Sequence, residues 1–492
     1  MPDTLSLDRR ALDRARLSRD PRFDGKFFTA VTSTGIYCRP VCPSPPSKST
    51  NVRYYATAAA AAEAGYRPCL RCRPEAAPGT PAWMGTSAVV RRALRLIDSG
   101  ALDSDSVSAL AARVGVGTRH LGRLFSHHVG ASPITVAQTR RLHFAKRLLD
   151  ETDLPVTQIA LASGFSSIRR FNSAFQATYE RPPRQLRRRA GEPARCEPGD
   201  EVALRLAYRP PYDWMQVRKF LAARALPGVE HVDEHGYART VGLSSGPAVV
   251  RVRPLPEADA LEFRVRGAPA AALLQLSGIA RRTFDLAADP TRIAQVLRSD
   301  ALLAPLVRNQ PGLRIPGAWD PFECAVRAIL GQQVSVATGR TFVSRLVARA
   351  GSRIDCGTDR LTHLFPTPEQ VAAAELEGLG VTAPRVGALR AMTRALIEGR
   401  LDFNAPPEEV AAVLASLPGL GDWTAQYVVL RALGEPDAFL AGDLIVRRAA
   451  GNGGTLLSAR ELSKRAECWR PWRGYAVLHL WTNDCRHRVS HA

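Results

Sequence analysis

The sequence has no run of about 18 apolar residues, which is the length that a helix needs to cross a bilayer. Its N-terminal residues include Asp3, Asp8, Arg9 and Arg10 and lack the apolar core of a signal peptide, so we expect a cytoplasmic protein. Extremes of composition are missing as well, since hydrophobic residues make up 45% and charged residues 23% of the 492 residues. This balance excludes a largely disordered or collagen-like chain.

Lysine is scarce: it supplies five of the 67 basic residues, and arginine supplies the other 62. Aspartate and glutamate number only 46, which gives the chain a formal net charge of +21. A GC-rich genome would explain the preference for arginine over lysine, but it does not explain the surplus of positive charge. Because each neutralised phosphate releases condensed counterions, the charge favours a nucleic-acid partner over an anionic membrane surface.

The chain is longer than one hydrophobic core usually supports, and two Pro/Gly-rich stretches, residues 74–86 and 187–200, divide it. The middle segment has helical periodicity, with an apolar face from Val89 to Ile97 that stops at Gly100. The last segment begins with alternating apolar and polar residues over about 200–268, which predicts strands. Helical spacing returns from about Ala270 onward.

Four of the nine cysteines form two close pairs, Cys38 with Cys42 and Cys69 with Cys72. In a cytoplasmic chain such pairs indicate a metal site rather than disulfides. Two short cysteine hairpins at this separation can place four thiolates tetrahedrally around zinc. A first segment of about 75 residues has a small core, so metal binding would also help it to fold. A zinc clip without further function remains open on spacing alone.

The middle segment contains the same pattern twice, at residues 107–125 and 155–175: a helix, a glycine turn and a second helix. An ordinary helical bundle with a basic face would show a similar pattern. Each second helix has a polar outer face, and the candidate DNA contacts on these faces are Arg119, Arg123, Arg169 and Arg170. The residues expected in the core are Leu121, Leu124, Phe125, Phe171 and Phe175.

Two family resemblances follow from these motifs. The residues around the cysteines, 35–43, 51–55 and 65–74, closely resemble the N-terminal domain of Ada-type methylphosphotriester repair proteins. The tandem repeat, which ends in Arg181-Pro-Pro, resembles the AraC-type DNA-binding domain. The first resemblance implies one zinc ion held by Cys38, Cys42, Cys69 and Cys72, with Cys38 accepting a methyl group from a DNA phosphotriester. The second implies recognition helices in successive major grooves.

The C-terminal segment contains Leu417-Pro-Gly-Leu-Gly421, a tight turn between two helices, and Asp443 follows 22 residues later. Backbone amides of such a turn can hold a phosphate without reading sequence, although a plain helix connector has the same pattern. Asp422 is interpreted as a helix cap. Asp443 opens a helix, so helix capping is also the alternative to a chemical role for its carboxylate.

Several stretches between residues 210 and 481 resemble AlkA-type 3-methyladenine DNA glycosylase II of the helix-hairpin-helix superfamily, including Ala328–Ser335 and Trp469–Trp481. The resemblance implies that Asp443 is catalytic. It assigns Tyr427, Trp481 and Trp423 to the base pocket, and Gly419, Gly421, Gln332 and Gln333 to DNA binding. Trp423 stands where lyase-active relatives carry lysine, so no Schiff base is expected. Gln333 stands where a relative has an apolar wedge.

The expected protein is multidomain and mainly α with α+β parts. It begins with a small four-cysteine zinc domain (1–75) and a tandem helix-turn-helix domain (86–186). A strand-rich subdomain (200–285) and an all-α helix-hairpin-helix glycosylase core (286–492) follow. The sequence contains no Pro-Cys-His-Arg motif, so we expect it to lack the O6-methylguanine transferase domain of full-length Ada.

The expected function is a DNA alkylation-damage response. It combines a monofunctional glycosylase, stoichiometric methyl transfer to Cys38, and transcription regulation. Expected partners are double-stranded DNA at alkylated sites and promoters, and RNA polymerase during activation, with no membrane. The protein is expected in the cytoplasm, associated with the nucleoid. A monomer is expected because no heptad seam is visible. Two alternatives stay open: a sensor and regulator whose glycosylase-like domain binds DNA without catalysis, and a glycosylase with a purely structural zinc domain.

Overall fold

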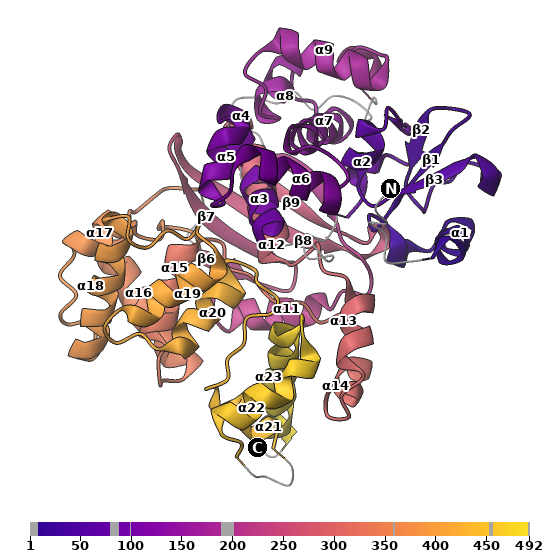
Figure 1. Ribbon diagram of the computed structural model, residues 1–492. Helices are drawn as coiled ribbons and strands as arrows, with labels where there is room; N and C mark the ends of the chain where they lie inside the picture. Colours follow the sequence, from indigo (N-terminus) through magenta and orange to yellow (C-terminus); the bar gives the residue numbers. More distant parts are fainter. Residues whose placement is uncertain are drawn as a thin grey trace. The chain divides into compact units, whose positions relative to one another are not determined.

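The computed structural model describes residues 8–78, 88–98, 100–187, 201–357, 360–451 and 456–490 (Figure 1). The chain divides into two compact units, Met1–Pro210 with Val252–Arg281, and Pro211–Arg251 with Arg282–Ala492. Most of the two predicted linkers, residues 79–86 and 188–200, lies outside the described residues. Among the described helices, none is both long and apolar enough to cross a membrane.

The cysteine-bearing part of the first unit contains four strands and two helices: β1 (Phe28–Val31), β2 (Ile36–Cys38), β3 (Val52–Tyr55), β4 (Arg67–Pro68), α1 (Arg9–Leu17) and α2 (Ala58–Glu63). The sheet order is β3-β1-β2-β4, and only the β2–β4 pair is parallel. Side chains alternate between the faces of a strand. Phe28, Ala30 and Tyr37 therefore pack into a small core, while Thr29 and Cys38 belong to the opposite face.

The tandem helix-turn-helix is confirmed in the first unit. Val90, Ala93, Leu96 and Ile97 form the predicted apolar face and pack into a core with Leu121 and Phe125. Gly115 and Gly164 adopt positive φ in the two turns, where glycine avoids a steric cost. The helices are α3 (Ala88–Asp98), α4 (Ala101–Ser104), α5 (Val107–Arg113), α6 (Thr118–His128), α7 (Pro133–Glu151), α8 (Val156–Ala162), α9 (Ile168–Tyr179) and α10 (Pro183–Leu186). Phe171 and Phe175 are buried as expected, and Leu124 is half-buried against the core.

Helix α7 connects the two helix-turn-helix motifs and also contacts the cysteine-bearing part. The Tyr37 hydroxyl lies 2.8 Å from Nε2 of His143. Lys146 pairs with Asp150 at 2.6 Å, and Arg73 reaches the same carboxylate at 2.9 Å. These groups are largely buried, and removing one partner of a buried ion pair is strongly destabilising. The contacts therefore tie the segment after Cys72 to α7.

The strand-rich region that the alternating residues predict is confirmed between residues 202 and 266. It forms a five-stranded sheet with the order β5-β9-β8-β7-β6. β5 and β9 pair antiparallel with buried Leu204 opposite buried Phe263. The elements are β5 (Val202–Ala207), α11 (Trp214–Ala222), β6 (Glu230–Val232), β7 (Tyr237–Leu243), β8 (Gly246–Leu255) and β9 (Ala260–Arg266).

From Leu273 onward the described elements are helices, as the return of helical spacing predicts. They are α12 (Leu273–Thr283), α13 (Pro290–Leu297), α14 (Leu303–Asn309), α15 (Pro321–Leu330), α16 (Val336–Ala350), α17 (Pro368–Ala373), α18 (Ala383–Ile397), α19 (Pro407–Ser416), α20 (Asp422–Ala432), α21 (Leu444–Ala449), α22 (Ala459–Arg465) and α23 (Arg473–Ser490). The candidate site residues of the second unit come from the turn between α15 and α16, the hairpin of α19 and α20, the start of α21 and helix α23.

Candidate functional site

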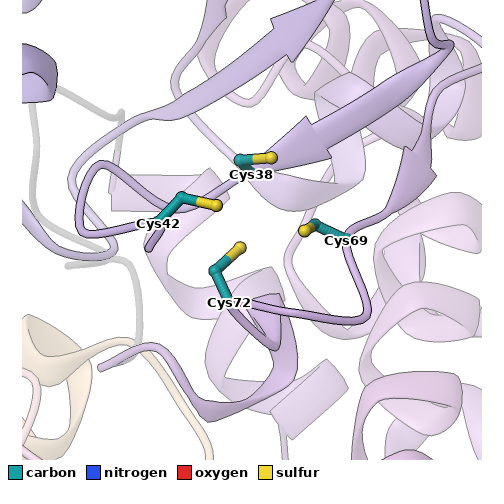
Figure 2. A group of neighbouring side chains, drawn as sticks. All are labelled: Cys38, Cys42, Cys69 and Cys72. Carbon is teal, nitrogen blue, oxygen red and sulfur yellow. The ribbon is translucent and has the colours of Figure 1, made fainter. Parts of the chain in front are cut away.

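Four cysteine side chains converge beside the first sheet, and Figure 2 shows their sulfur atoms turned toward one another. Cys38 ends β2, and Cys69 directly follows β4, the parallel neighbour of β2. Cys42 and Cys72 come from the turns that follow. The four Sγ atoms lie within 4.8 Å of one another. Zn–S bonds of about 2.3 Å in a tetrahedron separate the sulfurs by roughly 3.8 Å, so this donor set fits zinc.

Backbone and side-chain hydrogen bonds hold the two cysteine hairpins together. The amide of Cys69 donates to the carbonyl of Tyr37 at 2.9 Å, which continues the β2–β4 pairing. Arg39 lies between the first two cysteines and donates from Nε to Asp24 at 2.9 Å and from Nη1 to the Cys72 carbonyl at 3.0 Å. Its own amide donates to Cys72 Sγ at 3.3 Å. One arginine thus fixes the first hairpin against the second.

The sulfurs are close enough that their ionisation is linked. Hydrogen bonding with Cys38 lowers the pKa of Cys42, and it lowers the pKa of Cys69 to about 6. Hydrogen bonding with Cys42 raises the pKa of Cys38, and hydrogen bonding with Cys38 raises that of Cys72. A divalent cation offsets the charge of four neighbouring thiolates, as zinc does in sites built from four cysteines.

A cavity of about 640 Å³ opens beside Cys38 on the sheet face that does not pack into the core. Cys42 and Cys69 also line it. The cavity wall includes the end of α9, because Thr178 and Tyr179 belong to the lining. Five arginines line the space: Arg16, Arg19, Arg39, Arg67 and Arg71. Three of them pair with carboxylates, Arg16 with Asp13, Arg39 with Asp24 and Arg67 with Glu180.

In the second unit, the carboxylate of Asp443 collects three N–H donors. Trp423 Nε1 donates to Oδ2 at 2.9 Å, and Trp481 Nε1 donates to Oδ1 at 3.1 Å. The amide of Val446 donates to Oδ1 at 3.0 Å, so Asp443 is also the N-cap of α21. Asp443 is only 8% exposed. The predicted capping interaction therefore exists, and the same carboxylate also joins the two predicted base-pocket tryptophans.

The three predicted base-pocket aromatics form one cluster around this carboxylate. Trp423 and Tyr427, one turn apart on α20, stack with ring centroids 5.2 Å apart and planes inclined by 14°. Trp481 on α23 lies 6.4 Å from Tyr427. Indole N–H groups that bind a carboxylate fix its orientation, while the exposed parts of the rings can contact a flat apolar ligand. Asp443, Trp423, Tyr427 and Trp481 are therefore one constellation, drawn from three helices.

The predicted glycine hairpin lies between α19 and α20. Gly419 has φ +77°, and a Cβ atom there would lie 2.9 Å from the Cβ of Ala388, so this position requires glycine. Gly421 is the N-cap of α20. The interpretation of Asp422 as a cap is wrong: Asp422 is the first residue of α20, where its negative charge instead faces the positive end of the helix dipole.

Gln332 and Gln333 occupy the turn between α15 and α16 but differ in environment. The side-chain amide of Gln332 donates to the carbonyl of Gly419 at 3.2 Å and to Thr424 Oγ1 at 3.0 Å. Gln332 therefore connects its own turn to the hairpin. Gln333 is exposed and adopts φ +52°, a left-handed conformation that is costly for a residue with a side chain. Such a strained, exposed tip is consistent with a residue that contacts a ligand.

The four candidate arginines of the helix-turn-helix motifs, Arg119 and Arg123 on α6 and Arg169 and Arg170 on α9, are all exposed. Arg123 also lies 3.1 Å from Nδ1 of His120, one turn earlier on the same helix. The α9 face is anchored at its N-terminus by Ser167, whose hydroxyl accepts from the amide of Arg170 at 3.5 Å. Their exposure leaves these side chains accessible to a ligand, and contact with DNA stays a prediction.

Three neighbours of the sites escape sequence reasoning. Arg431 donates to the Tyr427 hydroxyl at 2.7 Å. The two residues lie four positions apart on α20, a spacing that makes side chains neighbours on a helix, so the sequence could have indicated this contact. Phe220 of α11 lies under the same guanidinium at 4.4 Å, which no local pattern indicates. Glu180, the C-cap of α9, pairs with Arg67 at the Cys38 cavity at 2.7 Å across 113 positions of sequence.

Four family models match consecutive parts of the chain. The metal binding domain of Ada matches residues 11–75, and a helix-turn-helix domain matches residues 110–189. The AlkA N-terminal domain matches residues 203–320, and the HhH-GPD superfamily of base excision DNA repair proteins matches residues 326–473. Each model covers a region in which the motifs above occur.

Relatives match the chain both as a whole and in parts. A probable bifunctional transcriptional activator/DNA repair enzyme AlkA of Mycobacterium tuberculosis is 42% identical over 95% of both chains. DNA-3-methyladenine glycosylase 2 of Escherichia coli is 34% identical over 57% of this chain and 96% of its own length. The structure of a 3-methyladenine DNA-glycosylase from Archaeoglobus fulgidus has a TM-score of 0.50 at 22% identity, covering 57% of this chain and 97% of that one, and it supports the fold alone.

Proposed function

The chain belongs to the family of bifunctional transcriptional activator/DNA repair proteins that join Ada-type to AlkA-type domains, and we propose that it answers DNA alkylation damage in two ways. The AlkA-type half removes alkylated bases such as 3-methyladenine. The Ada-type half accepts methyl groups from DNA phosphotriesters and then activates transcription. The observation that carries the proposal is the constellation of Asp443 with Trp423, Tyr427 and Trp481, because it supplies a fixed carboxylate beside aromatic rings.

The proposed base removal is hydrolysis of the N-glycosidic bond. An alkylated purine is cationic and leaves readily as a neutral base, so little acid catalysis is needed. The sugar becomes oxocarbenium-like, and the carboxylate of Asp443 stabilises that developing positive charge. The target base must leave the DNA stack, and Tyr427 and Trp481 would then bind it by cation–π contact. With Trp423 in place of a lysine, the product is an abasic site without a Schiff base.

The hairpin and the neighbouring turn would hold the DNA backbone during this step. Amides at Gly419 and Gly421, together with the N-terminus of α20, offer donors to a phosphate. Gln333 would fill the gap that the extruded base leaves, since it is the exposed tip of its turn. Gln332 would act by holding that turn to the hairpin.

The proposed methyl transfer takes place at Cys38. One zinc ion bound by the four cysteines would keep their sulfurs deprotonated and nucleophilic. The Cys38 sulfur forms a bond to the methyl carbon, the carbon–oxygen bond breaks, and its electron pair stays on the phosphodiester. The charge of the site changes from −2 to −1. Removing one negative charge about 7 Å from a phosphate is worth roughly 0.5–2.5 kcal/mol, so methylation strengthens DNA binding.

The regulatory part of the proposal joins this switch to the helix-turn-helix motifs. Arg119, Arg123, Arg169 and Arg170 would contact promoter DNA once the methylated zinc domain binds the backbone more tightly. RNA polymerase would then be recruited by a protein that acts as a monomer. The net charge of +21 supports DNA as the common partner of both halves.

Base release from methylated duplex DNA tests the glycosylase. Wild type is expected to release 3-methyladenine, and Asp443→Asn is expected to abolish release while DNA binding and folding persist. No release from the wild type, despite DNA binding, would leave a sensor and regulator with a DNA-binding domain of the glycosylase fold.

Transfer of an isotopic methyl group from methylphosphotriester DNA tests the sensor. One methyl group per chain is expected on Cys38, with metal analysis giving one zinc. Cys38→Ser should lose the transfer. A wild type that binds zinc but takes up no methyl would make the zinc domain purely structural.

A further inference from the structure

A buried cation lies at the far end of the aromatic cluster from Asp443. Arg431 is 8% exposed and donates from Nη1 to the Tyr427 hydroxyl at 2.7 Å. Its guanidinium carbon lies 5.5 Å from the centre of the Tyr427 ring. Tyr427 stacks on Trp423, whose indole N–H binds the carboxylate of Asp443. The stack therefore has a carboxylate at one end and a guanidinium at the other.

This arrangement matches the movement of charge in the proposed reaction. When the glycosidic bond breaks, its electron pair passes from C1′ of the sugar to a nitrogen of the base. The sugar gains positive charge, which Asp443 favours, and the base gains negative charge, which a cation near the base favours. Fixed charges placed along the direction of electron flow stabilise the transition state more than the ground state.

We propose that Arg431 is a positioning residue that acts through the Tyr427 hydroxyl to stabilise the departing base. Guanidinium N–H groups only donate, so Arg431 occupies a lone pair of the phenol oxygen and leaves the phenol O–H free to donate to the base. A cationic base leaves neutral, and the proton of the attacking water goes to solvent. A neutral purine leaves as an anion, and the phenol O–H donates a hydrogen bond to it. The proton released by the attacking water then protonates the base nitrogen that was bonded to C1′.

The proposal rests on the proposed glycosylase function, and it adds a dependence on the leaving group. Cationic bases leave well without help, so the Arg431–Tyr427 pair matters little for them. Neutral purines are poor leaving groups, and the pair matters most where negative charge develops fully. The pair thereby widens the range of excised bases from cationic alkylated purines to neutral ones.

A purely structural role for Arg431 is the competing explanation, because Arg431 also donates to the carbonyls of Pro316 and Gly317. Substituting Arg431 would disturb these contacts. Tyr427→Phe avoids this, since it keeps the ring and its stacking and removes only the hydroxyl. Tyr475→Phe is the matched control: it removes a buried tyrosine hydroxyl of the same unit, bound to Asp285 at 2.6 Å, without touching the cluster.

Single-turnover rates on two duplexes test the proposal, one containing cationic 7-methylguanine and one containing neutral hypoxanthine. Tyr427→Phe is expected to lower the ratio of the hypoxanthine release rate to the 7-methylguanine release rate about 10- to 100-fold, because only the neutral base loses a hydrogen bond to a fully developing negative charge. Tyr475→Phe is expected to leave the ratio of the two release rates unchanged.

Equal slowing of both bases by Tyr427→Phe would overturn the proposal, because a structural defect does not discriminate between leaving groups. A wild type that releases 7-methylguanine but no hypoxanthine would overturn it as well. A wild type that releases neither base would refute the glycosylase function itself, so the two failures are distinguishable.

Discussion

The double role of Asp443, as helix cap and as proposed catalyst, can be separated by combining two substitutions. Asp443→Asn keeps the shape of the side chain but replaces one acceptor oxygen by an NH2 group. If the amide oxygen stays at Oδ1, it still accepts from Val446 and Trp481, and the NH2 group then faces the Trp423 indole N–H. A buried N–H left without an acceptor costs about 1–3 kcal/mol, which is the expected loss of unfolding free energy.

Adding Trp423→Phe removes the donor that is left unpaired. Asp443→Asn should therefore cost much less than 1–3 kcal/mol of unfolding free energy in the Trp423→Phe background. A double-mutant cycle measures this difference separately from the cost of the smaller ring. Base release should not recover, because neither variant restores the negative charge. Losing a preorganised charge at the transition state costs on the order of 100-fold or more.

The assay pairs urea unfolding of wild type, both single variants and the double variant with 3-methyladenine release from methylated duplex DNA. Abasic-site DNA binding serves as the control for an intact surface. If the double variant regained both stability and base release, Asp443 would be a helix cap and the catalytic assignment would be refuted.

Three further predictions follow from individual contacts. Gly419→Ala should lower the unfolding free energy by about 1–3 kcal/mol and weaken DNA binding, whereas Gly421→Ala, with open space around it and φ −108°, should cost much less; urea unfolding compares them. Burial lowers the pKa of both His479 and His143 to about 4, so below pH 6.5 these positions take up protons in the unfolded chain and not in the folded one. His479 should therefore lower the free energy of unfolding by up to about 3 kcal/mol between pH 6.5 and pH 4, and urea unfolding of His479→Leu should show the loss reduced by this share, with that of His143 remaining. Glu180→Gln should release Arg67 at the Cys38 cavity and tighten binding of unmethylated DNA a few-fold at low salt, and unchanged affinity in a salt titration would contradict this.

Local chemistry was sufficient to place several parts of the fold. Two cysteine pairs predicted a metal site because thiolates at this spacing suit one small cation, and their four sulfurs do converge. The repeated pattern of helix, glycine and helix predicted both helix-turn-helix motifs because a left-handed turn favours glycine, and Gly115 and Gly164 do have positive φ. Strand alternation and helical periodicity were readable in the same way, since each depends on neighbours within a few residues.

The interpretation of Asp422 as a helix cap was wrong because local sequence does not fix where a helix begins to within one residue. A cap and the first helical residue differ by one position, and local sequence rarely separates them. The structure gives the cap to Gly421 and the first turn to Asp422.

The sequence by itself determined the cysteine set, the two helix-turn-helix repeats and the resemblance that singles out Asp443, because each is written in residues close together or in a family's motif. Tertiary structure alone decided which donors hold the Asp443 carboxylate, since Trp423, Val446 and Trp481 come from three helices. It also placed Phe220 of α11 against Arg431 and paired Glu180 with Arg67. Such contacts depend on how distant helices pack, and the electrostatic environment of a site is a sum over side chains that no local pattern brings together.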